Sequence, residues 1–228
     1  MRSKSKEELS NQGKKEIKKK TKNSPKLLKY EKELYKQGVK FICGVDEVGR
    51  GPLVGPVVAA AVILPINYHL EGLNDSKKLS EKKREELFEV IKKDALEFHI
   101  EIVSEKVIDQ KNIYQATKDA MTLIANKLNA EVVLTDAMPL ERCDKEVIDI
   151  IKGDQKSVSI AAASILAKVT RDRIMYELDK KYPEYDFKHN KGYPTKKHLE
   201  ALEQYGALDI HRRSYGPVYK LDQMKFDI

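Results

Sequence analysis

The sequence predicts an α/β protein in which a mixed sheet packs against helices and is followed by a helical C-terminal part. Two observations predict this class. Apolar, strand-like segments alternate with segments of helical periodicity, and no fixed period repeats along the chain. The length of 228 residues, 41% of them hydrophobic, suits one domain with a sizeable core.

Five short apolar segments are predicted to be strands. They are bounded by turn-forming or charged residues, as strands of a buried sheet usually are. They cover Phe41–Asp46, Val57–Leu64, Phe98–Val103, Glu131–Thr135 and Val147–Ile151. We expect the first of these strands to run parallel to the strands near residues 131 and 147, which a backbone structure can test.

The helical segments show apolar residues three and four positions apart. They cover Pro25–Gly38, residues 80–96, Asn112–Leu128, Ser157–Leu178 and Thr195–Gln204. Ser80 and Thr195 are candidate N-caps, because a hydroxyl oxygen there can accept a hydrogen bond from the first helical turn.

The basic charge of the chain is concentrated at its start. Residues 1–40 carry 14 Lys or Arg and 5 Glu, although the net charge of the whole chain is only +7. We therefore expect a basic disordered arm over residues 1–24, a leading helix over 25–38 and a catalytic domain over 39–228. A polybasic arm attracts polyanions such as nucleic acids, and the alternative is a solvated tail that aids solubility.

Several classes of protein are disfavoured by simple counts. The longest apolar run, Val57–Leu64, lies between two prolines and is far shorter than the ~20 residues of a membrane-spanning helix. Cys43 and Cys143 are the two cysteines, too few for a disulfide framework, and no signal peptide is recognisable at the N-terminus. We therefore expect a cytoplasmic globular protein with no membrane partner.

Carboxylates stand at the end of three predicted apolar strands. Asp46 and Glu47 follow the first strand, Asp136 follows the fourth, and Asp154 comes soon after the fifth. If these strands lie side by side, the four acids meet at one edge of the sheet and repel one another. Divalent Mg²⁺ or Mn²⁺ relieves such repulsion, so the pattern favours a two-metal site for phosphoryl chemistry. Each acid alone would also suit an ordinary turn.

The glycines after the first acid pair allow a ligand to approach the backbone closely. Gly49, Arg50 and Gly51 follow the acids after one intervening residue, Val48. The spacing matches neither a dinucleotide-binding fingerprint nor a phosphate-binding loop of nucleotide triphosphatases. A plain turn between two strands is the alternative interpretation.

Six segments of the chain, in the same order, resemble bacterial ribonuclease HII, a type 2 ribonuclease H family. They are Gly44–Leu64, Asp75–Leu79, Lys152–Ser157, Ala161–Val169, Lys191–Thr195 and His211–Tyr215. The resemblance spans roughly residues 26 to 218. Val48 and Val54 stand where the family more often has alanine.

This resemblance implies a fold like that of ribonuclease H, with a five-stranded mixed sheet and a helical C-terminal part that binds substrate. It implies an endonuclease that cuts the RNA strand of RNA–DNA hybrids and incises 5′ of single ribonucleotides in duplex DNA, leaving 3′-hydroxyl and 5′-phosphate ends. Roles in ribonucleotide excision repair and DNA replication would follow. We expect a monomer whose partners are these nucleic acids.

The resemblance also assigns residues to the site. Two ions, Mn²⁺ or Mg²⁺, would be held by the family's four acids, with Asp46 shared between them; the acids correspond to Asp46, Glu47, Asp136 and Asp154. Gly49, Arg50 and Gly51 would read the ribose 2′-hydroxyl. Tyr193 would pack on the sugar of the following deoxynucleotide.

Ser76, Lys77 and Lys78 are candidates for contacts with backbone phosphates, and the alternative is a solvated approach to the next helix.

Three rival functions remain open: a ribonuclease HIII, a junction resolvase of similar fold, and a basic nucleic-acid-binding protein without catalysis. The Arg50 side chain and the absence of a large N-terminal domain disfavour the first. The four acids disfavour the last, since carboxylates repel phosphate unless a cation lies between them.

Deleting residues 1–24 is expected to weaken duplex binding and to flatten its dependence on salt, because fewer counterions are then released from the phosphates. The position of cleavage should not change. Fluorescence anisotropy of a labelled duplex over a salt series measures the first effect. Unaltered affinity at low salt would identify the segment as a solubility tail.

Overall fold

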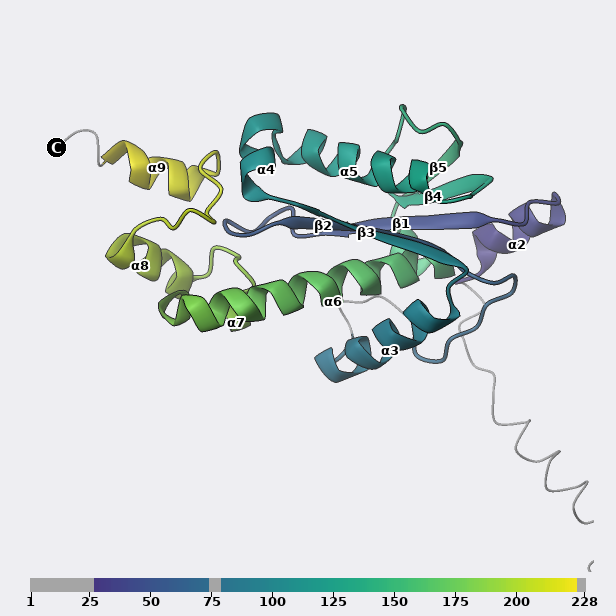
Figure 1. The fold of residues 1–228 in the computed structure, drawn as a ribbon, viewed down its shortest axis with the longest axis horizontal. Coiled ribbons are helices and arrows are strands. Elements are labelled where there is room, and N and C mark those ends of the chain that lie inside the picture. Colours follow the sequence, from purple (N-terminus) through teal and green to yellow (C-terminus); the bar gives the residue numbers. More distant parts are fainter. Residues whose placement is uncertain (1–26, 74–78, 225–228) are drawn as a thin grey trace, which may run out of the picture.

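The computed structural model describes residues 27–73 and 79–224, in which one five-stranded sheet lies between two layers of helices (Figure 1). The strand order is β3-β2-β1-β4-β5. The strands are β1 (Ile42–Val48), β2 (Val57–Ile63), β3 (Glu97–Val103), β4 (Val132–Asp136) and β5 (Glu146–Ile150). The predicted mixed-sheet α/β class is confirmed, and each predicted strand is present within a few residues of its expected bounds.

The sheet is antiparallel on one side of β1 and parallel on the other. β1 pairs antiparallel with β2, which pairs antiparallel with β3. β1 pairs parallel with β4, and β4 pairs parallel with β5. The expected parallel orientation of these three strands is confirmed, with β5 placed beyond β4 rather than beside β1. Their carboxyl ends therefore meet at one edge of the sheet.

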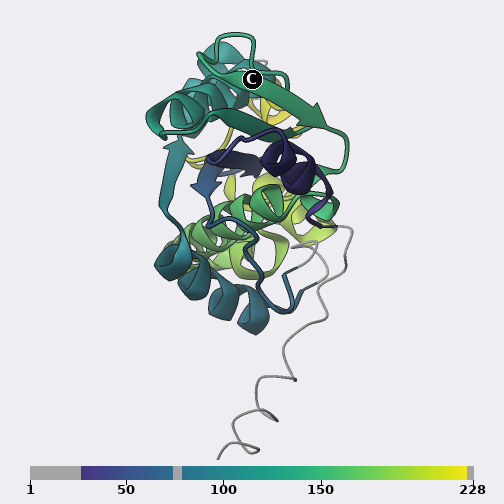
Figure 2. The ribbon, with the colours of Figure 1, turned by 90° about the vertical axis from the view of Figure 1, so that its right-hand side faces the viewer.

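The helices cover both faces of the sheet. They are α2 (Lys29–Lys36), α3 (Glu81–Asp94), α4 (Glu105–Lys111), α5 (Ile113–Lys127), α6 (Val158–Lys181), α7 (Phe187–Asn190), α8 (Lys196–Tyr205) and α9 (Gly216–Met224). Figure 1 shows α4 and α5 on one side and α3 and α6 on the other, and Figure 2 shows the sheet end-on between these layers. None of the helices in the described ranges is long and apolar enough to cross a membrane.

Three predicted helix starts are confirmed by capping hydrogen bonds. The hydroxyl oxygens of Ser80, Ser157 and Thr195 each accept a bond from a backbone N–H three residues further along the chain. The leading helix, by contrast, covers only Lys29–Lys36 of the predicted 25–38. Helix α4 was not predicted, because it is short and polar and buries only Ile108.

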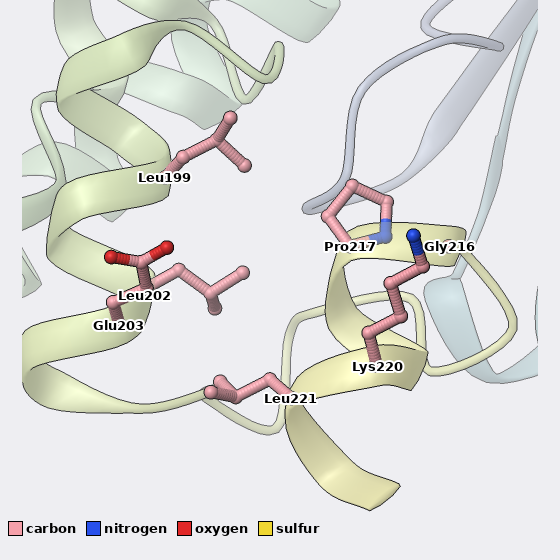
Figure 3. A pocket seen from close by; sticks show the side chains of 7 residues that line it. All are labelled: Leu199, Leu202, Glu203, Gly216, Pro217, Lys220 and Leu221. Carbon is pink, nitrogen blue, oxygen red and sulfur yellow. The ribbon is translucent and has the colours of Figure 1, made fainter. Parts of the chain in front are cut away.

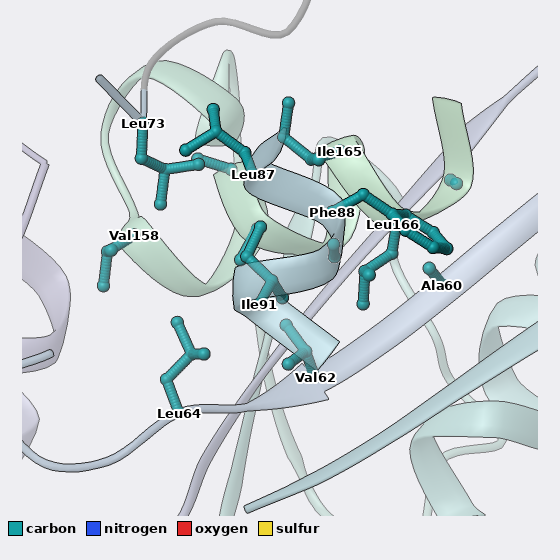
Figure 4. Packing of buried hydrophobic residues seen from close by; sticks show 14 of the residues in the cluster. Ala60, Val62, Leu64, Leu73, Leu87, Phe88, Ile91, Val158, Ile165 and Leu166 are labelled. Atoms are coloured by element: carbon teal, nitrogen blue, oxygen red, sulfur yellow. The ribbon is translucent and has the colours of Figure 1, made fainter. Parts of the chain in front are cut away.

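The core between the sheet and α6 is built by alternation along β2. Val58, Ala60 and Val62 face α6 and α3, whereas the intervening residues face α5. Figure 4 shows Leu87, Phe88 and Ile91 of α3 packed with Leu166 of α6 above Ala60 and Val62. The first half of α6 is buried because it crosses the centre of the sheet.

Gly44 brings the backbone of α6 into direct contact with β1. A Cβ atom built on Gly44 would lie 2.1 Å from the carbonyl carbon of Ser159 and 2.4 Å from the nitrogen of Ile160. Real Cβ atoms do not approach backbone this closely, so the helix can rest here only on a glycine. The N-terminus of α6 is thereby fixed next to the middle of β1.

Replacing Gly44 with Ala is expected to destabilise the protein by about 3 kcal/mol or more, the upper part of the range for overpacking a core. The added methyl group would push α6 off the sheet. The midpoint of urea unfolding measures the loss. Gly216→Ala is the control, because a Cβ at Gly216 would meet nothing within 4 Å. Equal stability of the two variants would contradict this contact.

Candidate active site

Asp46 and Asp136 are neighbours across two parallel strands. In the register of β1 and β4, Val45 lies opposite Thr135, so the next residue of each strand is one of the two acids. Side chains alternate along a strand, and Leu134 packs with Ile160 of α6. Asp46 and Asp136 therefore leave the sheet on the face covered by α6. Asp46 is buried there and accepts a hydrogen bond from the side chain of Ser164 on α6.

Asp154 lies on a single turn of 3-10 helix, Gly153–Gln155, which leads into α6. The turn is closed onto the end of β4, because the N–H of Gly153 donates to Oδ1 of Asp136 over 2.8 Å. A Cβ on Gly153 would lie 2.6 Å from Cδ1 of Ile160 and 3.3 Å from the carbonyl oxygen of Thr135. Glycine at this position thus lets the turn carry Asp154, which is buried, to the same edge of the sheet.

Glu47 follows Asp46 on β1 and, because side chains alternate, points to the opposite face of the sheet. Oε1 of Glu47 lies 3.5 Å from Nη1 of Arg50. Oε2 is buried and has no hydrogen-bond partner among the described residues. A buried carboxylate oxygen without a donor is costly, so this atom is a candidate ligand for a cation.

Burial and neighbouring acids raise the pKa values of Asp46 and Glu47. The pKa of Asp46 lies well above its ordinary value of 3.8, first because the carboxyl is buried and then because Glu47 and Asp136 repel its charge. Burial also raises the pKa of Glu47, and Asp136 adds to the rise, while Arg50 opposes it. In the absence of a cation, protonation therefore relieves the repulsion at this edge.

The donor set fits a hard divalent cation on chemical grounds. All four predicted ligands are carboxylates, which Mg²⁺ and Mn²⁺ prefer, and Glu47 contributes a buried oxygen that has no donor in the described part of the chain. In residues 27–73 and 79–224, no group of three or more His, Cys, Asp or Glu side chains is arranged to hold a metal ion as it stands. The structure brings together the backbone positions of Asp46, Asp136 and the turn that carries Asp154.

The loop that follows the acids is held from inside by a buried arginine. The Arg212 guanidinium, fully buried at 0% exposure, donates to the carbonyl oxygens of Gly49, Arg50 and Gly55 at 2.7–3.0 Å. The hydroxyl of Tyr215 donates to the carbonyl of Arg50 as well. The carbonyl groups of this loop are thus turned towards the protein interior. Among the described residues, the N–H groups of Arg50 and Gly51 have no hydrogen-bond partner.

A second buried arginine holds the far end of the same loop. Arg171 of α6 donates to the carbonyl oxygens of Val54, Pro56 and Lys191 at 2.9–3.2 Å. Burial, with repulsion from Arg212, lowers the pKa of Arg171 to about 10. Gly49 has φ +97°, and a Cβ there would lie 2.2 Å from Nε of Arg171. Glycine is therefore required both for the turn and for the arginine.

Tyr193 lies against the Gly-Arg-Gly segment. A Cβ on Gly51 would lie 3.1 Å from a ring carbon of Tyr193, whose side chain is 45% exposed. The structure thus brings together Gly49, Arg50, Gly51 and Tyr193. The predicted phosphate contacts Ser76, Lys77 and Lys78 lie outside the described residues.

Two buried histidines hold the backbone at Tyr193. The N–H of Leu208 donates to Nδ1 of His211, so the proton of His211 must sit on Nε2. That nitrogen lies 3.3 Å from Nε2 of His198, whose Nδ1 lies 2.9 Å from the carbonyl oxygen of Tyr193. His211 therefore donates to His198, and His198 donates to Tyr193. Burial lowers the pKa of both histidines, which keeps the two imidazole rings neutral.

Sequence reasoning missed the roles of Arg171, Arg212 and Tyr215. Arg212 and Tyr215 stand in one of the resembling segments, but nothing in their spacing indicates which carbonyls they bind. Arg171 looks like an ordinary charged position on a long helix. The interior position of such a residue can be found only from the fold.

A separate apolar pocket lies between α8 and α9 (Figure 3). Leucines of both helices line it, together with Glu203 and Lys220. None of the four acids lines this pocket, so it is not the candidate active site.

The comparisons with known proteins agree with this geometry. A family model for ribonuclease HII matches residues 43–218. The chain is 57% identical over 203 residues to a ribonuclease HII of Listeria monocytogenes, covering 88% of this chain and 77% of that protein. It is 56% identical over 188 residues to a ribonuclease HII of Acetivibrio thermocellus, covering 82% of this chain and 73% of that protein.

Solved structures show the same fold. The ribonuclease H2 of Pyrococcus horikoshii is 27% identical, with a TM-score of 0.71, and covers 82% of this chain and 100% of its own. A ribonuclease HII of Archaeoglobus fulgidus, solved in complex with PCNA, is 29% identical with a TM-score of 0.67, over 77% and 95% of the two chains. A Bst ribonuclease HIII solved with Mn²⁺ shares the fold at 16% identity, with a TM-score of 0.62. The match covers 92% of this chain and 76% of that protein.

Asp46→Asn is expected to stabilise the metal-free protein at neutral pH, because it removes a buried charge that its neighbours repel. A carboxyl with a raised pKa binds more protons in the folded chain than in the unfolded one, so wild-type stability falls as the pH rises above 3.8 towards the folded pKa. The gain in melting temperature should be about 2–4 °C for each 1 kcal/mol of free energy.

Melting curves recorded in chelator between about pH 5 and pH 8 test this expectation, with the difference between variant and wild type growing as the pH rises. Asp149→Asn, at an exposed acid on β5, is the matched control and should change little. A lower melting temperature for Asp46→Asn at pH 8 would contradict the inferred repulsion.

Proposed function

The chain belongs to the ribonuclease HII family, which cleaves the RNA of RNA–DNA hybrids, and we propose that it also incises duplex DNA 5′ of a single embedded ribonucleotide. The products would carry 3′-hydroxyl and 5′-phosphate ends. Such a reaction serves the removal of ribonucleotides left by DNA replication. The observation that carries the proposal is the adjacency of Asp46 and Asp136 on parallel strands, within reach of the turn that carries Asp154.

The four carboxylates would hold two divalent cations, Mg²⁺ or Mn²⁺, with Asp46 shared between them and Glu47, Asp136 and Asp154 completing the set. When bound, these ions supply activation of a water molecule and neutralisation of charge on the phosphate. The raised pKa values of Asp46 and Glu47 imply that both acids give up protons when cations bind. Cation affinity should therefore fall as the pH is lowered.

The Gly-Arg-Gly loop would recognise the ribose 2′-hydroxyl. Its carbonyl groups are occupied by Arg212 and Tyr215 on the inner side, while the N–H groups of Arg50 and Gly51 have no partner among the described residues. A 2′-hydroxyl can accept a hydrogen bond from such a group, and a deoxyribose cannot. Because Arg171 and Arg212 fix the loop, it would meet the sugar without first having to be ordered.

Tyr193 would pack on the sugar of the deoxynucleotide that follows the ribonucleotide. Its half-exposed ring lies beside Gly51, so one surface can contact two consecutive sugars. All of these groups belong to one chain, which supports activity as a monomer. We assign this activity to the cytoplasm, where a bacterial chromosome offers both substrates.

The proposal is tested by cleavage of a duplex that carries one ribonucleotide, beside a long RNA–DNA hybrid and an all-DNA control that includes a branched junction. Each reaction is run with Mg²⁺, Mn²⁺ or chelator. We expect a metal-dependent cut 5′ of the lone ribonucleotide and cleavage of the hybrid. Asp46→Asn should lower the rate by at least about 100-fold, whereas Asp149→Asn on β5 should retain it.

Each rival function gives a different result in this assay. Cleavage of the long hybrid alone would indicate specificity like that of ribonuclease HIII. Cleavage of the branched DNA would indicate a resolvase, and binding without any cleavage would indicate a binding protein. Full activity of Asp46→Asn would show that the acids do not perform the chemistry.

A further inference from the structure

We propose that Glu31 of α2 is a positioning residue for the acidic site, because its contact with Ser157 fixes the turn that carries Asp154. The inference rests on the proposed role of Asp154. It concerns a residue outside the region of residues 43–218 that the family model matches. The element that precedes the catalytic domain would thus act in shaping its site.

Glu31 is buried completely at the N-terminus of α6. Its side chain is 0% exposed. Oε1 accepts a hydrogen bond from the hydroxyl of Ser157 over 2.5 Å and another from the N–H of Ser159 over 3.1 Å. Leu28, one turn earlier, forms an antiparallel bridge with Ser157. Glu31 and Leu28 therefore both contact Ser157.

Ser157 links Glu31 to the acids through short backbone bonds. Its hydroxyl oxygen caps α6 by accepting from the N–H of Ile160, and its own N–H donates to the carbonyl oxygen of Gly153 over 2.8 Å. The N–H of Gly153 in turn donates to Oδ1 of Asp136. The path from Glu31 to Asp136 thus passes through Ser157, which follows the turn that holds Asp154, and through Gly153, which begins it.

Attachment of α2 to the domain does not require this carboxylate. Leu34 of α2 already packs in a buried cluster with residues of β1, β4, β5 and α6. Ser157 caps α6 at the N–H of Ile160, and Glu31 adds a bond to the N–H of Ser159 in the same first turn. The second carboxylate oxygen of Glu31 is buried without a hydrogen-bond partner among the described residues, which an apolar residue here would avoid. Glu31 thus holds both the N-cap residue and the first turn of α6, and a positioning role accounts for an acid that packing alone leaves unexplained.

The test compares Glu31→Ala and Glu31→Gln with the wild type and with Glu33→Ala. Glu33 lies on the same helix but is exposed and pairs only with Lys36 in the described chain, so its variant controls for loss of a carboxylate from α2. The first readout is hydrogen exchange of the amides of residues 153–157 in metal-free protein. The second is the dissociation constant of Mn²⁺, measured by calorimetry. The third is kcat and KM on an RNA–DNA hybrid.

We expect Glu31→Ala to weaken Mn²⁺ binding by about 10-fold, the lower end of the effect of losing a group that orients a ligand. Exchange at residues 153–157 should accelerate, and kcat should fall while the KM for the hybrid changes by less than about two-fold. Glu31→Gln keeps an acceptor oxygen and should restore most of the affinity. Glu33→Ala should match the wild type in all three readouts.

A folded Glu31→Ala protein with wild-type exchange and Mn²⁺ affinity would overturn the inference. If that variant does not fold, Glu31→Asp decides, because it keeps the charge but shortens the reach to Ser157. It should shift exchange and affinity in the same direction, and unchanged values would refute the role of Glu31. If the wild type itself neither binds Mn²⁺ nor cleaves, the proposed function fails, while the exchange of residues 153–157 still tests the contact.

Discussion

The contact between the backbone of α6 and the middle of β1 determines where the site can form. Gly44 permits this contact, and it places the first turns of α6 against the strand that ends in Asp46 and Glu47. Ser164 of α6 reaches Asp46 from above the sheet, and the turn before α6 reaches Asp136 from the side. The acids thus come from three segments far apart in sequence, and one helix holds these segments together.

The burial of acids at this edge of the sheet lowers the stability of the fold. Burial and repulsion from neighbouring acids raise the pKa of Asp46 and of Glu47, so holding these two carboxyl groups at the edge of the sheet costs folding free energy. The surrounding structure supplies the compensation through apolar layers on both faces of the sheet. Burying the carbonyl groups of the loop after the acids also has a cost, since these groups lose their hydration. Hydrogen bonds from the two buried guanidinium groups replace that hydration.

Sequence reasoning was most successful where local patterns decide the structure. The five strands, the caps at Ser80 and Thr195, and the acids at strand ends follow from apolar runs and from the residue types at their boundaries. It failed for α4, whose only buried residue is Ile108.

Contacts between segments that are distant in the chain could not be predicted from the sequence. The carbonyl groups of the loop after the acids that Arg171 and Arg212 bind lie more than a hundred residues away in the chain. Glu31 has the sequence environment of a surface residue on a charged helix, and its burial arises from the packing of α2 over the start of α6. No periodicity or motif expresses such a relation, because it depends on how complete elements are stacked.

The inward-facing carbonyls of the Gly-Arg-Gly loop also bear on what the protein can distinguish in a nucleic acid. Peptide groups whose oxygens bind Arg212 present their hydrogens outward, and those hydrogens form a surface that does not depend on any side chain. Sugars and phosphates repeat unchanged along a strand, whereas base edges differ at every step. On the proposed function, a main-chain surface of this kind would read the kind of nucleotide and be indifferent to its base.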